Sequence, residues 1–318
     1  MRRESRFILW CACATLPAVV LGQGRSPADS LMGPGVSLAL AQSRATRISN
    51  VRYDLSLEVS ERDTAFGRVT VEFQVERPTD VIIDFRGPAL TRSRANGRVS
   101  KAIAWNGAHI RVPSAFVKVG VNRLDFEFKA IVAAAGASII RVRDPSDGAV
   151  YLYTLLVPSD ANQLFPCFDQ PDLKARVNLT LTTPLGWRAV ANGRRLRADS
   201  TSRGSLHVFQ ESEPISTYLI AFAAGPWVAK TSASSQKPIT LYVRKSRAAE
   251  ADADSVILAN DRAATWLEQY FARPFPSRSS TSMTWHRRSR LAAWSTRAPS
   301  FTPRNASSIG SVPPAANR

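Results

Sequence analysis

Histidine and cysteine are scarce in this sequence of 318 residues, which contains three of each. Two of the cysteines, Cys11 and Cys13, lie in an apolar run near the start. Cys167 has no partner for an internal disulfide bond in the rest of the chain, and we expect it to be a small buried apolar side chain. His109 and His207 have no acidic cluster nearby at ligand spacing. The sequence therefore offers no recognisable zinc site and no Ser-His-Asp triad on these histidines.

Acidic residues are missing from the last part of the chain. From Ser277 to Arg318 there are seven arginines, no Asp, Glu or Lys, and no hydrophobic period. Such a segment buries too little apolar surface to offset its ordering entropy, so residues 277–318 are predicted to be a disordered basic tail. The formal net charge is +17, but no basic stripe interleaved with aromatic residues stands out, and no nucleic-acid partner is expected. Binding of nucleic acid or another anionic surface through the tail is the weaker alternative.

The start of the chain has the pattern of an export signal. Three arginines within the first six residues precede the uncharged, mostly apolar run Phe7–Leu21. This run is too short for a comfortable membrane span. We expect residues 1–41 to be a signal peptide and leader, cleaved after Gly22 or Ala41, and the protein to be periplasmic or secreted. An uncleaved N-terminal anchor is the alternative.

The body of the sequence is typical of antiparallel β structure. Several segments alternate apolar and polar residues with a period of two, which predicts strands with one buried and one solvated face. Ser216–Gly225 is more continuously apolar and predicts a strand buried on both faces. We expect a mostly β fold, either a sandwich or a large curved sheet. The alternating segments are residues 54–59, 68–76, 123–129 and 176–182, and the turn signals are Asn96-Gly97, Asn106-Gly107, Asp147-Gly148 and Asn192-Gly193.

A helix is predicted from Asp252 to Phe271. Asp252 suits the N-cap position, and Pro274 and Pro276 are expected to end the helix. The helix has one wide apolar face, so it either packs on the sheet or begins a second domain. The apolar stripe consists of Val256, Ala259, Ala263, Trp266, Leu267 and Tyr270.

The stretch "FPCFDQPD" places two prolines around a carboxylate. Pro166 and Pro171 each fix a backbone φ angle, and Asp169 can accept hydrogen bonds from backbone N–H groups between them. The residues alone favour a structural corner between two strands over a rigid rim that presents residues to a ligand.

Two segments resemble signatures of one enzyme family, the zinc metallopeptidases of the aminopeptidase N type. The similarity lies in the N-terminal domain of that family and covers about residues 44–276. The first signature segment, Tyr153–Ala175, matches at Tyr153, Thr154, Pro158, Phe165, Pro166, Cys167, Phe168, Asp169, Pro171, Lys174 and Ala175. The second signature segment, Pro214–Gly225, matches at Pro214, Ser216, Thr217, Tyr218, Leu219, Ala221, Phe222 and Gly225.

The resemblance implies a saddle-like antiparallel β-sandwich domain that covers the cleft of a following catalytic domain. That domain binds the peptide substrate through Gly-x-Met-Glu and binds zinc through H-E-x-x-H and a later Glu. Neither motif occurs in this sequence, so we expect the chain alone to hold no cofactor and to be inactive. By motif position Thr154, Leu155, Val157 and Pro158 lie near the approach of the substrate. Leu155 and Val157 replace a Gln and a Glu of the family pattern.

The expected organisation follows from this resemblance. After the leader, residues 42–246 form the β domain, and residues 247–276 form a helix and turn that lead into a missing catalytic domain. Read one base earlier, the codons after Pro276 can encode the Gly-Gly-Met-Glu segment that continues the family pattern. We therefore interpret residues 277–318 as a frameshifted tail of a truncated chain. The alternative is a free-standing secreted β-sandwich binding module.

Overall fold

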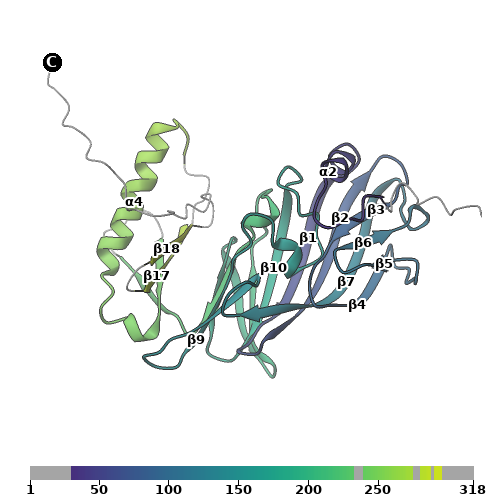
Figure 1. Ribbon diagram of the computed structural model, residues 1–318. Coiled ribbons are helices and arrows are strands. Elements are labelled where there is room, and N and C mark those ends of the chain that lie inside the picture. Colours follow the sequence, from purple (N-terminus) through teal and green to yellow (C-terminus); the bar gives the residue numbers. More distant parts are fainter. Residues whose placement is uncertain (1–29, 233–238, 275–279, 288–289, 296–318) are drawn as a thin grey trace, which may run out of the picture.

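The computed structural model describes residues 30–232, 239–274, 280–287 and 290–295. Within these ranges the largest element is an 11-stranded sheet with the order β11-β14-β9-β8-β7-β2-β1-β10-β13-β12, and β4 pairs with β7 beside this path. The predicted mostly β fold is confirmed (Figure 1). The strands are β1 (Ser49–Glu58), β2 (Thr64–Val75), β4 (Ala89–Ala95), β7 (Gly120–Ala133), β8 (Ile139–Arg143), β9 (Val150–Thr154), β10 (Ala175–Thr183), β11 (Arg188–Ala191), β12 (Arg195–Thr201), β13 (Gly204–Phe209) and β14 (Phe222–Gly225).

The centre of this sheet follows the alternation in the sequence. In β1 the apolar side chains of Leu55 and Leu57 are buried, while the polar residues between and beside them are more exposed. Most neighbours are antiparallel, but β1 pairs with β10 in parallel, with Leu55 opposite Leu179, and β7 also pairs with β8 in parallel. The chain from β2 to β9 provides the long connection that the extended parallel pair of β1 and β10 requires. The end of β7 meets the start of β8 after only a short connection.

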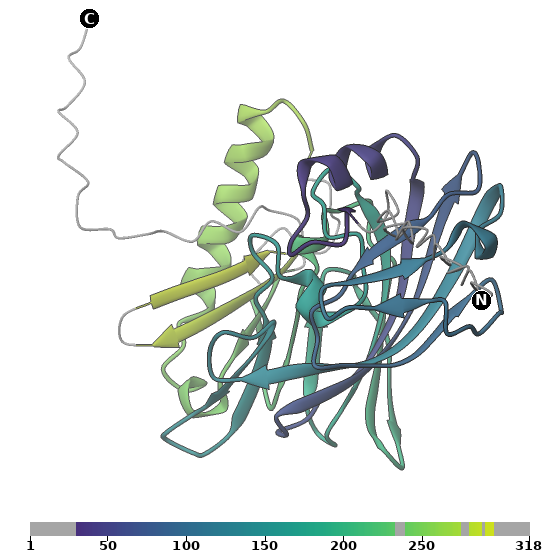
Figure 2. The ribbon, with the colours of Figure 1, turned by 45° about the vertical axis from the view of Figure 1, so that its right-hand side comes forward.

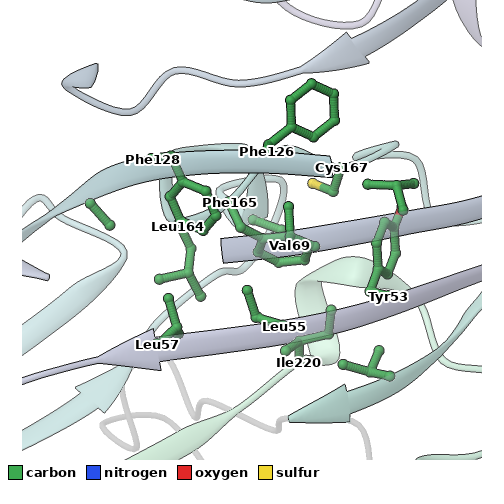
Figure 3. Packing of buried hydrophobic residues seen from close by; sticks show 14 of the residues in the cluster. Tyr53, Leu55, Leu57, Val69, Phe126, Phe128, Leu164, Phe165, Cys167 and Ile220 are labelled. Carbon is green, nitrogen blue, oxygen red and sulfur yellow. The ribbon is translucent and has the colours of Figure 1, made fainter. Parts of the chain in front are cut away.

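A second layer covers the buried face of the large sheet. It contains a three-stranded sheet of β3 (Val81–Asp84), β6 (His109–Val112) and β5 (Ala104–Trp105), together with the helix α3 (Ala161–Leu164) and the loop that follows it. One continuous apolar core lies between these layers. Figure 3 shows Phe165 and Cys167 of that loop among Tyr53 and Val69 from the strands of the large sheet.

The chain before β1 belongs to this folded unit. The helix α2 (Leu38–Ala45) begins at the N-cap Ser37, whose Oγ accepts a hydrogen bond from the Leu40 backbone N–H at 3.2 Å. The expected boundary between residues 41 and 42 falls inside this helix. Residues 1–29 of the signal peptide and leader predicted for residues 1–41 lie outside the described residues.

The C-terminal part has its own small sheet beside the large one (Figure 2). This four-stranded sheet has the order β15-β16-β17-β18, and α4 packs on its strands β15 and β16. The 3-10 turn η3 (Lys245–Arg247) connects β16 to the segment before α4. The elements are β15 (Val228–Thr231), β16 (Ile239–Val243), α4 (Ala253–Tyr270), β17 (Ser280–Arg287) and β18 (Arg290–Ser295).

The structure confirms the predicted helix and its cap. Asp252 is the N-cap, and its Oδ1 accepts a hydrogen bond from the Ser255 backbone N–H at 3.0 Å. The helix ends at Tyr270, before Pro274, and Pro276 lies outside the described residues. Its buried apolar contact is Ile257, which packs on β16 and was not part of the predicted stripe.

Most of the predicted stripe on α4 is exposed. Trp266 is 59% exposed and Tyr270 is 68% exposed, and their rings stack with centroids 5.1 Å apart. Leu267 and Phe271 are exposed beside them. We call these four residues the α4 aromatic patch.

The structure departs from the expected disorder after Ser277 at residues 280–287 and 290–295, which form β17 and β18. The strand β17 joins β16 in parallel and β18 in antiparallel orientation. An edge strand offers unpaired backbone groups, and a segment with Thr and Trp residues can pair with it without supplying a large core. Residues 275–279, 288–289 and 296–318 of the expected tail lie outside the described residues. No helix in the described part of the chain has the length and apolar character needed to cross a bilayer.

Candidate functional site

The first signature segment forms a buried corner. The rings of Phe165 and Phe168 pack edge-on against Tyr53 and Phe73, with centroids 5.3 and 5.5 Å apart. The Phe168 backbone N–H donates to the Tyr53 hydroxyl at 2.9 Å. Cys167 is fully buried, and burial raises the pKa of its thiol well above the ordinary value. The thiol therefore stays protonated at neutral pH and acts as a small apolar side chain.

Asp169 connects this corner to two other parts of the chain. Its carboxylate is 4% exposed and accepts three hydrogen bonds. Oδ2 accepts from the backbone N–H of Asn162 at 3.1 Å and from Asn162 Nδ2 at 2.7 Å. Oδ1 accepts from the Thr217 hydroxyl at 2.7 Å. These donors lie on α3 and in the second signature segment, and not between the two prolines as the sequence predicted.

The second signature segment is hydrogen-bonded to the first at several points. Thr217 is 48 positions from Asp169 and binds it directly. The hydroxyl of the neighbouring Ser216 donates to the Pro171 carbonyl oxygen at 2.6 Å. Both residues lie at the start of the 3-10 turn η2 (Thr217–Leu219), in which Tyr218 is half-buried. The two signatures therefore form one hydrogen-bonded unit.

Asp84 is a second carboxylate in this unit, and it was not predicted from the sequence. Arg44 donates to both of its oxygens, at 2.7 Å to Oδ2 and 2.6 Å to Oδ1, and both side chains are buried. The Asp169 backbone N–H donates to Asp84 Oδ2 at 2.9 Å. Burial alone would raise the pKa of Asp84, but the charge of Arg44 and the surrounding donors lower it. The sequence signal was a carboxylate at the end of the apolar run "VIID", which alone does not identify a partner.

The segment from Thr154 to Pro158 contains both buried and exposed residues. Thr154 is fully buried, and its hydroxyl accepts a hydrogen bond from the Phe222 backbone N–H at 3.0 Å. Leu155 is 48% exposed and Val157 is 41% exposed, and Pro158 follows Val157 through a cis peptide bond. Thr154 therefore has a structural contact, while Leu155 and Val157 are available at the surface.

A junction attaches the C-terminal part to the large sheet. Asp144 follows β8, and its Oδ2 accepts a hydrogen bond from the Ser246 hydroxyl at 2.6 Å and lies 3.0 Å from Arg244 Nη1. Burial raises the pKa of Asp144, but the hydrogen bond from Ser246 and the charge of Arg244 help to lower it overall. The Tyr151 and Trp227 rings also meet here, with centroids 4.4 Å apart. The polar contacts therefore anchor the segment between β16 and α4, and the aromatic contact anchors the chain just before β15.

A cavity of about 640 Å³ lies between α2 and the start of β3. Leu31, Leu40 and Ile82 give it an apolar wall, and Arg47 and Asp80 lie at its polar side. In the described ranges no three side chains of His, Cys, Asp or Glu are grouped as metal ligands. The described geometry is that of a buried, hydrogen-bonded unit formed by the two signature segments, with an exposed segment at Leu155–Pro158 beside it.

Comparisons with known proteins agree with this geometry. Residues 49–219 match the Peptidase M1 N-terminal domain. Aminopeptidase N of Streptomyces lividans is 28% identical over 254 residues, which cover 76% of this chain and 29% of that protein. Human glutamyl aminopeptidase is 27% identical over 244 residues, covering 71% of this chain and 25% of that protein. The chain thus spans less than a third of the length of either relative.

Proposed function

The chain belongs to the family of peptidase M1 N-terminal domains, and from that membership we propose that it is the cleft-covering domain of a zinc-dependent aminopeptidase. In this proposal the whole enzyme removes N-terminal amino acids from peptides. The observation that supports it most is the connection of the two signature segments through Asp169 and Thr217, inside the matched range. The relatives named as aminopeptidases support the same class of reaction.

The zinc ion of this proposal does not fit the chain itself. The described residues contain no group of three side chains able to hold a metal, and the printed sequence has no H-E-x-x-H motif. The proposal therefore assigns zinc, and the activation of water, to a following catalytic domain. The chain alone is proposed to be inactive.

The contribution of this domain to substrate binding is assigned to its exposed segment at Leu155–Pro158. A buried strand end at Thr154 fixes where the segment leaves the sheet. Leu155 and Val157 present apolar side chains where the family pattern has a Gln and a Glu. An apolar rim cannot pair with a charged side chain, so we expect no preference for a basic first residue of the peptide.

The partner of the α4 aromatic patch is assigned to the catalytic domain that follows in the longer relatives. Ile257 holds one face of the helix on the small sheet, and the patch points away from that contact. Exposed aromatic side chains that stack on one helix are typical of a surface that another domain covers.

The proposed export signal has a structural constraint. Cleavage after Gly22 leaves the whole described unit intact. Cleavage after Ala41 would divide α2 and separate the Leu40 side chain, which is buried, from the domain. We therefore assign cleavage to the first position, and the N-terminal mass of the exported protein tests it.

We also propose that the residues after Pro276 are read from a shifted frame. Sequencing the DNA downstream of the Pro276 codon tests this proposal, because the frame read one base earlier must continue into the H-E-x-x-H motif.

A chimera tests the proposed function. Residues 30–246 replace the matching domain of Streptomyces lividans aminopeptidase N, and hydrolysis of aminoacyl-anilides is measured with and without a chelator. We expect chelator-sensitive activity, and none from the same catalytic part without an N-terminal domain. A chimera that folds, as judged by circular dichroism, but has no activity would contradict the proposal. Zinc-dependent hydrolysis by the 318-residue chain alone would contradict the assignment of the chemistry to another domain.

A further inference from the structure

Both ring nitrogens of the buried His109 face oxygen atoms. His109 is the first residue of β6. Its Nδ1 lies 2.8 Å from Asp84 Oδ1. Its Nε2 lies 2.7 Å from the carbonyl oxygen of Gly33 and 3.0 Å from that of Gly35. The ring therefore joins β3 to residues 30–37, which precede α2 and which we call the N-terminal strap.

These contacts define the protonation state of the ring. A carbonyl oxygen can only accept a hydrogen bond, and a neutral imidazole has a single N–H. Asp84 cannot supply the missing proton, because Arg44 and the Asp169 backbone N–H already donate to its two oxygens. Both contacts of His109 can be hydrogen bonds only when both ring nitrogens carry protons. We propose that His109 is a buried imidazolium that fastens the N-terminal strap to the domain, and that its deprotonation releases the strap.

The charges around the ring favour this state. The charged groups near the ring are Asp84 on β3 and Arg44 on α2. Asp169 of the first signature segment lies next to Asp84, because its backbone N–H donates to the Asp84 carboxylate. Three donors converge on the Asp169 carboxylate, which is the arrangement of an ionised group. With His109 protonated, two cations stand against two carboxylates in this buried cluster. A neutral His109 would leave one net negative charge there, which is costly in a buried site.

The strap has other contacts that release would affect. Asn106 Nδ2 donates to the Met32 carbonyl oxygen at 2.9 Å, just before the glycines that His109 binds. Ser30 and Leu31 form part of the wall of the 640 Å³ cavity beside α2. Release of the strap would therefore open this cavity on its N-terminal side.

The stabilisation that His109 gives to the closed strap changes with pH in one direction. Burial disfavours the imidazolium, but the hydrogen bond and charge of Asp84 outweigh burial and raise the pKa of His109 above its ordinary value. A histidine with a raised pKa in the folded state contributes its full stabilisation of that state below the unfolded histidine pKa of about 6.5. This stabilisation is lost as the pH rises through the folded pKa. While Asp84 is ionised, the strap is thus closed below the folded pKa of His109 and opens as the pH rises through it.

The first measurement is the protonation of the ring in the whole chain. Ring 15N chemical shifts are recorded by NMR from pH 6 to 10, and the His109 signals are identified by their loss in His109→Gln. We expect both nitrogens to be protonated at pH 7.5, where a free histidine is about nine-tenths neutral. A neutral ring at pH 7.5 in the folded chain would overturn the inference without any variant.

The second measurement is native-state cleavage of the strap by chymotrypsin, normalised to a free peptide of residues 28–40. We expect the wild-type rate to rise with pH along the titration seen by NMR. In His109→Gln the rate should be faster by about tenfold to a hundredfold at pH 7 and independent of pH, as expected for a lost hydrogen bond to a charged group. Strap cleavage that is unaffected by pH or by His109→Gln would overturn the inference that His109 fastens the N-terminal strap.

His207→Gln is the matched control. His207 is also buried, but its Nε2 faces the Thr183 hydroxyl, which can donate or accept, and its pKa is lowered by burial. We expect this variant to cleave like the wild-type chain. Equal acceleration in both variants would mean that general destabilisation causes the cleavage, and it would overturn the specific role of His109. Neither measurement depends on aminopeptidase activity, so the inference can fail independently of the proposed function.

Discussion

Replacing Asp169 by alanine should destabilise the β domain measurably. The substitution removes the acceptor of three hydrogen bonds at a site where the carboxylate is 4% exposed. The Thr217 hydroxyl and the Asn162 side chain can turn toward other acceptors. The Asn162 backbone N–H is fixed at the start of α3 and cannot.

The magnitude follows from these groups. A buried donor left without a partner costs about 1–3 kcal/mol. An opposing contribution comes from the carboxylate itself, because burial raises the pKa of Asp169 and makes its ionisation less favourable in the folded than in the unfolded chain. Alanine removes this penalty together with the hydrogen bonds. The net loss in the free energy of unfolding should be about 1–3 kcal/mol, with one stranded backbone donor as the largest contribution.

Urea denaturation followed by circular dichroism measures this loss. With a slope of about 2 kcal/mol per molar urea, the midpoint should fall by roughly 0.5–1.5 M. Asp172→Ala is the matched control, since that carboxylate is exposed three positions farther along, and its midpoint should stay unchanged. A double-mutant cycle with Thr217→Val isolates the link between the two signatures. An Asp169→Ala midpoint equal to that of Asp172→Ala would refute the reasoning, because the carboxylate would then be solvated.

Three further outcomes are expected. The lowered pKa of Asp84 means that its stabilisation is present above the unfolded pKa of about 3.9 and is lost as the pH falls through the folded pKa. Acid denaturation of Asp84→Asn should therefore start from a lower stability and depend less on pH, as urea midpoints from pH 7 to 3 can show. A chain ending after Ser246 should keep the free energy of unfolding of the large sheet within about 0.5 kcal/mol, because α4 contributes no residue to the large core. Loss of the β signal in circular dichroism would instead favour a free-standing module with α4 in its own core. The double variant Trp266→Ser, Tyr270→Ser should self-associate less in sedimentation experiments, with an unchanged urea midpoint of unfolding. Unchanged association would mean that the chain does not associate through the α4 aromatic patch.

The sequence was sufficient for the elements whose pattern is local. Alternation in residues 54–59 and 176–182 predicted β1 and β10, and their buried leucines lie on the expected face. Asp252 was recognisable as a cap because its partner, the Ser255 N–H, is three residues away. The two signature segments were recognised as one family pattern, and the matched range confirms that recognition.

The sequence was insufficient where the partner is far away along the chain. Asp169 was expected to bind nearby N–H groups, but Thr217, one of its donors, is 48 positions away. Ile257 was omitted from the apolar stripe of α4 because the contact surface on β16 is not visible in helical periodicity. The roles of Arg44 and Asp84 depend on a pairing across 40 positions, for which a single sequence holds no signal.

The parallel contact of β1 with β10 also determines when the domain can fold. β1, β2 and β7 are antiparallel neighbours in space, whereas Asn178 of β10 bonds to Asp54 of β1 across 124 positions. Closing so long a loop costs entropy before the contact contributes anything, so such pairings form slowly. The strands from β1 to β7 can assemble while β10 is still absent from the sheet. Both signature segments lie at or beyond β9, so we expect their mutual hydrogen bonds to form late, when the second half of the chain is in place.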